Sequence, residues 1–366
     1  MKANKFLVKQ RAVSSTTAST TTKTSTTTTL SPAIKTTTED PCLYVPKPLS
    51  DFRRPDGRIS DVKCQEYIWD IKTRKQQEEE QNKRYECEIR QALLNGTEDD
   101  EAFHAIGGRI TLPGEFPHMG AIGWKAVEGT WIFKCGGTLI SSKFILTAAH
   151  CSKASERDNE IADITPKIVR LGDKNIIDSF DPNTGLIPTD VNIIRIINHP
   201  DYKAPKKYND ISLFELKEKV SFTDYIQPAC LYTGPGNILI GRNATLTGWG
   251  VIETVARTRS PELQAAVVDI LDSKKCDELL KPSCNRHWCG MTDSQVCAGK
   301  LSGGVDACQG DSGGPLQMKI PTITGQVYHV VGVISFGKGC ALPDLPGLYT
   351  RVSSFLDWIE NIVWKS

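Results

Sequence analysis

From residue 105 onward, the sequence predicts an all-β fold of antiparallel strands. Short apolar runs alternate with Gly, Pro and Asn/Asp turn signals, as in KFILTAAHC, ISLFELK and HVVGVISFG. This alternation is typical of β-sandwiches and β-barrels. The last segment, SSFLDWIENIVWKS, predicts a closing helix with one buried face, because its apolar residues recur at helical spacing. These apolar residues are Phe355, Leu356, Ile359, Ile362 and Val363.

Residues 1–38 are expected to be disordered. Eighteen of the 25 positions from 14 to 38 are Ser or Thr. Such a segment cannot bury enough apolar surface to offset the entropy lost on ordering. In an exported protein it would serve either as a stalk with O-linked sugars or as an undecorated linker, and both readings stay open.

Residues 39–104 form a second segment, which contains Cys42, Cys64 and Cys87. From Ile68 to Arg90 it is rich in glutamine and charged residues, with both signs of charge interspersed at helical spacing, and this predicts a solvated helix. With so few hydrophobic residues, the segment is a poor candidate for an independent core.

Charge and hydropathy exclude two classes of partner. The formal net charge of +1 gives no general attraction to nucleic acid or to an anionic membrane surface. No apolar stretch reaches the roughly 18 residues expected of a membrane-spanning helix. We therefore expect neither a nucleic-acid nor a membrane partner.

The cysteines indicate an oxidising compartment. Twelve cysteines are spread along the chain without zinc-finger spacing, which favours disulfides and a secreted, extracellular protein. Sequons for N-linked sugars at Asn95 and Asn243 agree with this. Residues 1–10 contain only the short apolar run FLV, whereas a secretory leader needs about 7–15 apolar residues. Either the true start lies upstream of Met1 or export follows another route, and the disulfide argument favours an upstream start.

Three short sequence motifs contain candidate catalytic residues. In GDSGGP, glycines surround Ser312, so the N–H groups of Gly310 and Ser312 are candidate donors to a developing oxyanion. A serine hydroxyl needs a base to become a good nucleophile. His150 in LTAAHC is the candidate base, and Asp210 in NDISLFELK is the candidate residue to orient it. Each residue alone is weak support, since an isolated His or Asp is usually structural.

The three residues occur in the order His150, Asp210, Ser312. In this order and in the motifs around these residues, the chain resembles the chymotrypsin-like (trypsin-type) serine proteases over residues 105–366. Other matching words are CGGTLIS at 135–141, TGWG at 247–250, VCAG at 296–299 and PGLYTRV at 346–352. The resemblance implies two six-stranded antiparallel β-barrels with the active site between them. It also implies that His150 takes the Ser312 proton and that Asp210 fixes the His150 tautomer.

The same resemblance implies cleavage after Arg or Lys. Asp306, six residues before Ser312, matches the carboxylate that pairs with a basic substrate side chain in the trypsin-like branch. The remaining substrate-binding positions are Ser335, Phe336, Gly337 and Gly347. The two glycines match pocket-wall positions that leave room for a long side chain. Phe336 departs from the usual Trp, which puts the finer preferences in doubt.

The resemblance further implies a disulfide pattern. Nine cysteines follow residue 104, so one is expected to hold the N-terminal part. The expected pairs are Cys135–Cys151, Cys276–Cys297, Cys308–Cys340, the additional Cys284–Cys289, the tether Cys87–Cys230, and Cys42–Cys64.

Activation is expected by cleavage after His104. Ala105-Ile106-Gly107-Gly108 matches the family's new amino terminus, and the freed ammonium of Ala105 would pair with Asp311. Most trypsin-like precursors carry Arg or Lys before this bond, so His104 implies an activating protease of non-tryptic specificity. Cleavage after Arg109 is the rival reading, but Gly-Gly does not follow at the matching place.

Within the family, the chain resembles the insect clip-domain cascade proteases of the snake and Persephone types. The matching segments are GRISDVKCQEYIWDI and GGRITLPGEFPHMGAIGW. A clip domain has six cysteines and residues 39–104 contain three, so this propeptide is an incomplete clip-like region. The expected partners are a protein substrate such as a downstream protease zymogen, the upstream activating protease and a serpin-type inhibitor.

No cofactor is required by this chemistry. LGDKNIID, which ends at Asp178, overlies a loop that binds calcium in some relatives, but its oxygen ligands are a weak match. Two other functions compete with a cascade enzyme. A digestive protease is disfavoured by the long N-terminal region, and an inactive adaptor by the intact His150, Asp210 and Ser312.

Overall fold

The computed structural model describes residue 48 and residues 57–92, 109–177, 180, 187–253, 258–304, 306–322, 325–338 and 340–365. The expected disorder of residues 1–38, the sequon at Asn95 and the bond between His104 and Ala105 lie outside these residues.

Six antiparallel strands form a closed first barrel. In order around it they are β2 (Met119–Lys125), β3 (Trp131–Ser141), β4 (Phe144–Thr147), β7 (Ser212–Leu216), β6 (Thr189–Asn198) and β5 (Ile168–Leu171). Strand β4, with the sequence FILT, is buried along its whole length, and β7, with the sequence SLFEL, is buried at every residue except Glu215. Ile122, Leu146 and Phe214 are fully buried members of this core.

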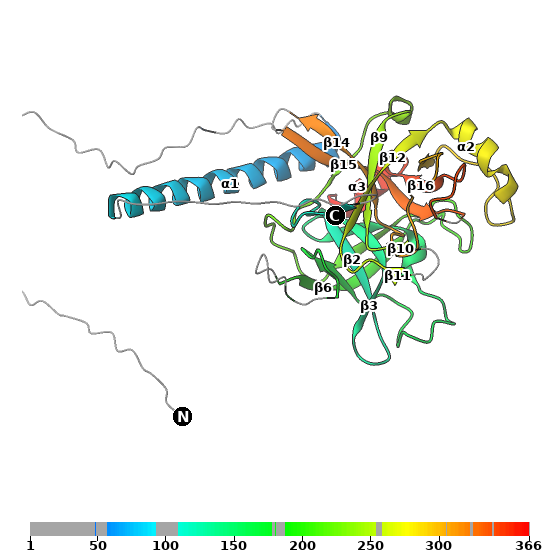
Figure 1. Ribbon diagram of the computed structural model, residues 1–366, viewed down its shortest axis with the longest axis horizontal. Helices are drawn as coiled ribbons and strands as arrows, with labels where there is room; N and C mark the ends of the chain where they lie inside the picture. The colour runs from blue at the N-terminus through cyan, green and yellow to red at the C-terminus, as the bar shows by residue number, and fades with distance from the viewer. Residues whose placement is uncertain are drawn as a thin grey trace, which may run out of the picture. The chain divides into compact units, whose positions relative to one another are not determined.

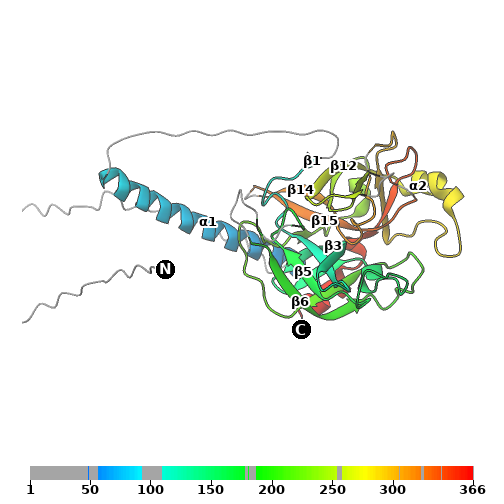
Figure 2. The ribbon, with the colours of Figure 1, turned by 60° about the horizontal axis from the view of Figure 1, so that its bottom comes forward.

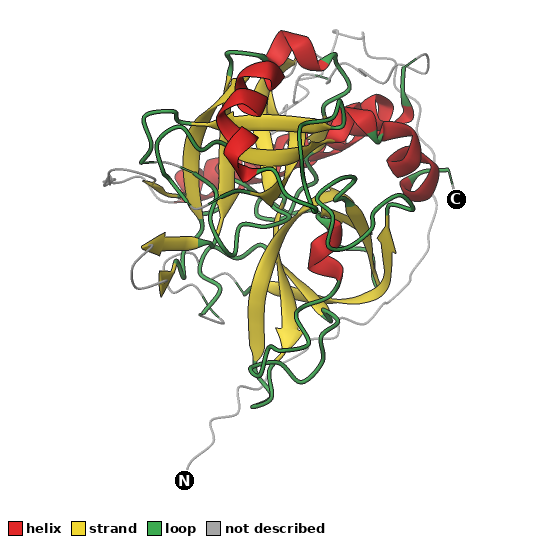
Figure 3. Ribbon diagram, turned by 90° about the vertical axis from the view of Figure 1, so that its right-hand side faces the viewer, coloured by secondary structure: helices red, strands yellow, loops and turns green. Residues whose placement is uncertain are grey.

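A second group of six strands closes in the same way. They are β9 (Asn243–Gly248), β12 (Gln264–Leu271), β13 (Gln295–Gly299), β16 (Gly347–Arg351), β15 (Gly325–Phe336) and β14 (Pro315–Thr322), and the pairing of β12 with β9 completes the circle. Leu316, Val331 and Tyr349 lie in its core. Figure 3 shows the two groups of strands, and the expected pair of six-stranded barrels is confirmed.

Shorter strands are added to this frame. β1 (Arg109–Ile110) pairs with β12, β8 (Cys230–Leu231) runs parallel to β15, and β10 (Val251–Glu253) pairs with β11 (Thr258–Arg259). The described residues also form four single-turn 3₁₀ helices: η1 (Ala149–Ser152), η2 (Gly236–Leu239), η3 (Lys281–Ser283) and η4 (Val352–Ser354).

In the described part of the chain, three α-helices accompany the barrels: α1 (Ile59–Ala92), α2 (Ser273–Leu280) and α3 (Leu356–Val363). The closing helix is confirmed as α3, since Phe355, Leu356 and Ile359 are buried. The solvated helix expected from Ile68 is longer than predicted, and its first part is not solvated. Figures 1 and 2 show α1 meeting the barrels at its N-terminal end. No helix in the described part of the chain is long and apolar enough to cross a membrane.

The docked end of α1 corrects the expected tether. Cys64 on α1 is bonded to Cys230 on β8, and both residues are buried beside Ile68. Cys87 lies further along α1 by about 35 Å at the ~1.5 Å rise of a helix, so it cannot reach Cys230. The expected pairs Cys87–Cys230 and Cys42–Cys64 are therefore wrong. Cys42 and the side chain of Cys87 lie outside the described residues.

The remaining expected bridges are present. They are Cys135–Cys151, Cys276–Cys297, Cys284–Cys289 and Cys308–Cys340.

Candidate functional site

His150 and Asp210 are held together by the first barrel. Strand β4 ends at Thr147 and leads directly into η1, which carries His150, while Asp210 lies just before β7, the neighbour of β4. His150 Nδ1 is 2.8 Å from Asp210 Oδ2, and the His150 backbone N–H donates to Asp210 Oδ1 at 2.9 Å. Two contacts to one carboxylate fix the position of the imidazole ring.

The second barrel completes the surroundings of Asp210. Ser335 Oγ donates to Asp210 Oδ2 at 2.5 Å, and Thr350 Oγ1 donates to the Asp210 carbonyl at 2.8 Å. The Asp210 side chain is 1% exposed. Burial alone would raise the pKa of Asp210, but the charge of His150 and the hydrogen bonds from His150 and Ser335 outweigh it and lower this pKa. Asp210 is therefore an anion suited to a cationic His150.

Ser312 lies in a tight loop before β14. The Gly136 N–H of the first barrel donates to the Ser312 carbonyl at 2.8 Å. Gly313 has a φ of 79°, and a Cβ there would lie 2.1 Å from Thr147 Oγ1, so only glycine fits. Gly310 is also left-handed, with a φ of 106°.

The N–H groups of Gly310 and Ser312 are available to a ligand. Within the described ranges, neither group donates a hydrogen bond to the protein. Most buried backbone N–H groups are paired, so two open donors beside a candidate nucleophile suit an oxyanion site.

One cavity of about 280 Å³ connects the predicted site residues. Its lining includes His150, Asp306, Ser312, Ser335, Phe336, Gly337 and Gly347. The structure thus brings together the residues that the sequence assigns to catalysis and to substrate binding.

Asp306 supplies a carboxylate to this cavity. The Ala307 N–H donates to Asp306 Oδ1 at 2.8 Å. Burial raises the pKa of Asp306 to about 6, and the hydrogen bonds from Ala307 and Ala341 only partly oppose this. A Cβ on Gly347 would lie 3.2 Å from Asp306 Oδ1, so a larger residue there would crowd the carboxylate. This carboxylate therefore favours a ligand with a cationic group.

Asp311 is held by backbone amides. The Gly250 N–H donates to its Oδ1 at 2.7 Å, and the Cys308 N–H donates to its Oδ2 at 2.9 Å. The expected pairing with the Ala105 ammonium concerns a residue outside the described part of the chain.

Several residues of the site were not foreseen from the sequence. Gly136, Thr350 and Lys207 belong to strands or loops that reach the site only through the fold. Lys207 had a weak signal, since it stands three residues before Asp210. Phe336 ends β15, and its ring meets Trp288 edge-on at 5.7 Å between centroids.

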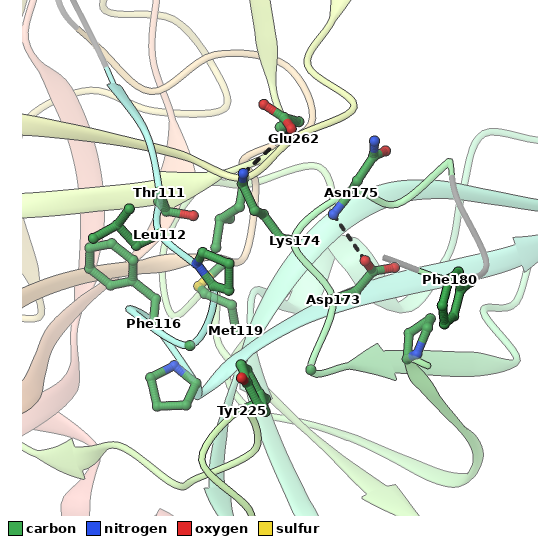
Figure 4. Close-up of a pocket in the computed structure, with 16 residues that line it drawn as sticks. Thr111, Leu112, Phe116, Met119, Asp173, Lys174, Asn175, Phe180, Tyr225 and Glu262 are labelled. Atoms are coloured by element: carbon green, nitrogen blue, oxygen red, sulfur yellow. Dashed lines mark hydrogen bonds and ion pairs between the residues drawn. The ribbon is translucent and has the colours of Figure 1, made fainter. Parts of the chain in front are cut away.

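A second cavity, of about 170 Å³, lies beside the loop considered for calcium. Figure 4 shows Lys174 paired with Glu262, and the Asn175 N–H bonded to Asp173. The Arg170 guanidinium is 3.7 Å from the Asp173 carboxylate. A cation already faces the principal carboxylate of this loop, so the described residues fit calcium poorly.

Among the described residues, two groups of Cys and His have ligand atoms close enough for a metal. They are Cys64–Cys230–His329 and Cys135–His150–Cys151. In both groups the two cysteines form a disulfide, so their sulfurs are not available as thiolates.

Comparison with known proteins gives consistent matches. The family model described as Trypsin matches residues 105–359. Serine protease Hayan of Drosophila melanogaster is 43% identical over 266 residues, and the match covers 72% of this chain and 39% of that protein. Serine protease snk of the same species is 35% identical over 327 residues, with 87% and 68% covered. Proclotting enzyme of Tachypleus tridentatus is 36% identical over 259 residues, with 70% and 65% covered.

Proposed function

The chain belongs to the trypsin family of serine proteases and is a serine endopeptidase, and we propose that it is made as an inactive precursor that cleaves after Arg or Lys once activated. The observation that carries the specificity is the cavity shared by Ser312, His150 and the half-buried carboxylate of Asp306. A substrate cation bound at Asp306 would place the following peptide bond beside Ser312.

In the proposed mechanism, His150 accepts the Ser312 proton as the hydroxyl oxygen attacks the peptide carbonyl. The N–H groups of Gly310 and Ser312 hold the resulting oxyanion, and His150 then returns the proton to the leaving amine. Asp210 stabilises the cationic His150 throughout, which its buried contacts with His150 and Ser335 support.

Activation is proposed to follow cleavage after His104, which would give residues 105–366 as the protease domain and residues 39–104 as a propeptide. The new Ala105 ammonium would pair with Asp311 and order the loop that carries Ser312. His104 does not suit an Arg/Lys-directed activator, so we infer an upstream protease of different specificity.

The setting is proposed to be an extracellular proteolytic cascade. The relatives include a proclotting enzyme and a phenoloxidase-activating enzyme. By analogy, the substrate would be a protein such as a downstream zymogen, and a serpin would be the inhibitor. Asn243 is exposed at the start of β9 and is a candidate for an N-linked sugar.

The test uses secreted precursor in which a recognition sequence for a site-specific protease ends just before Ala105. After cleavage it should hydrolyse a fluorogenic peptide ending in Arg, whereas intact precursor should not. The matched Ser312→Ala protein should lose roughly 10⁶-fold in turnover. Added active enzyme should leave unmodified precursor uncleaved at His104. Correctly cleaved protein that turns over no Arg, Lys or aromatic peptide would instead indicate an inactive adaptor.

A further inference from the structure

Lys207 carries the second formal charge in the substrate cavity. It lines the same cavity as Asp306, His150 and Ser312, and its ammonium lies 5.6 Å from the centroid of the Phe336 ring. Its side chain is half-buried, and among the described residues it makes no ion pair. A cation over an aromatic ring inside a cleft is attracted to that ring and remains able to bind an anion.

The backbone around Lys207 is fixed by the hairpin that contains the Cys284–Cys289 disulfide. The Lys207 N–H donates to the His287 carbonyl at 3.1 Å, and Gln295 Nε2 donates to the Lys207 carbonyl at 3.0 Å. The neighbouring Tyr208 hydroxyl donates to the Gly290 carbonyl at 3.0 Å. The position of Lys207 is therefore set by the fold.

The cavity thus presents one anion and one cation. Among the described residues that line it, Asp306 is the only acidic one and Lys207 is the only Lys or Arg. A ligand that complements both would carry a basic and an acidic side chain close together.

We propose that Lys207 selects protein substrates with Asp or Glu one or two positions before the Arg or Lys at the cleaved bond. This inference rests on the proposed function, because Asp306 must hold the basic residue for the preceding residues to reach Lys207. Lys207 is then a specificity-determining residue, and the enzyme recognises an acidic–basic pair.

The test compares kcat/KM for matched fluorogenic peptides ending in Arg. In one pair Glu or Gln stands one position before the Arg, and in the second pair two positions before it. The activated full-length enzyme should favour Glu over Gln by about fivefold in at least one pair. The preference should weaken as salt is raised.

The variants assign the preference to Lys207. Lys207→Gln should bring the Glu/Gln ratio to about one, Lys207→Glu should invert it, and Lys207→Arg should retain it. The control is Lys206→Gln, because Lys206 is exposed and does not line the cavity. Wild-type turnover of Arg peptides with equal rates for Glu and Gln in both pairs would overturn this inference and leave the proposed function standing. Absence of turnover on every Arg peptide would instead remove the proposed function.

Discussion

Asp306 shows how one side chain is tuned by its surroundings. Burial keeps its pKa near 6, well above the ordinary value of 3.8. A bound guanidinium favours the ionised form and must lower this pKa. Ligand affinity and the protonation of Asp306 are therefore linked, and without a ligand the Asp306 carboxyl is mostly neutral below about pH 6.

We predict that a small arylamidine cation binds the cleaved Ser312→Ala protein more weakly as the pH falls below 6. The dissociation constant should rise by up to about tenfold per pH unit, because the proton on Asp306 must be displaced. Isothermal titration calorimetry from pH 7.5 to 4.5 measures this.

Asp306→Asn is the matched control for this titration. It should weaken binding at pH 7.5 by roughly 10²-fold or more, as expected when one partner of a buried charge pair is removed. It should also remove the change in the dissociation constant near pH 6, because the carboxamide of Asn does not titrate. A wild-type affinity that is constant from pH 7.5 to 5 would contradict the assignment.

At the scale of single residues, the sequence predicted those site residues that lie in short continuous motifs. TAAHC, NDIS and GDSGGP each carry a candidate residue together with the neighbours that position it. Thr350 and Lys207 were missed, because their part in the site depends on strands and loops that meet only in the folded chain.

Among the elements, α1 is the one that the sequence described least well. Its buried residues Ser60, Cys64 and Ile68 recur every four positions, which makes a narrow stripe in an otherwise charged helix. Such a stripe is too short to distinguish from the solvated pattern around it. The partner of Cys64 is also beyond sequence reasoning, because pairing depends on which cysteine the docked helix presents.

An ion pair with a buried carboxylate joins the start of α1 to α3. Glu360 is 4% exposed, and its carboxylate accepts from Arg58 Nε at 3.0 Å and from Ser60 Oγ at 2.6 Å. Arg58 also pairs with the exposed Asp357. Loss of Arg58 would leave the Glu360 carboxylate buried without its cation, whereas the Asp357 carboxylate would remain solvated.

We predict that Arg58→Met lowers the free energy of unfolding by about 1–3 kcal/mol, because the buried Glu360 carboxylate loses its cation. Urea titration at pH 7 measures the change. Asp357→Asn is the control and should leave the midpoint nearly unchanged, since its side chain is 89% exposed. The double variant Arg58→Met/Glu360→Met should recover part of the loss. Equal losses for Arg58→Met and Asp357→Asn would show that burial does not set the strength of this contact.

At the scale of the whole molecule, the alternating strands and turns predicted antiparallel β structure, and the resemblance to the chymotrypsin-like serine proteases implied the two barrels. The arrangement of the N-terminal region was not predictable in either way. The tether, in contrast, joins residues 166 apart in sequence and spans the bond that is proposed to be cut. The proposed cleavage would convert the disulfide between Cys64 and Cys230 from a link within one chain to a link between two chains.

This gives a prediction that separates the observed tether from the one expected by sequence. After cleavage before Ala105, a Cys87→Ser protein should still migrate as one species on non-reducing denaturing electrophoresis, and reduction should separate it into two. A Cys64→Ser/Cys230→Ser protein should separate without reduction, because no other bridge of the described residues joins α1 to the barrels. Release of the N-terminal fragment by Cys87→Ser alone would restore the Cys87–Cys230 pairing. Retention is expected instead, since Cys87 lies too far along α1 to reach β8.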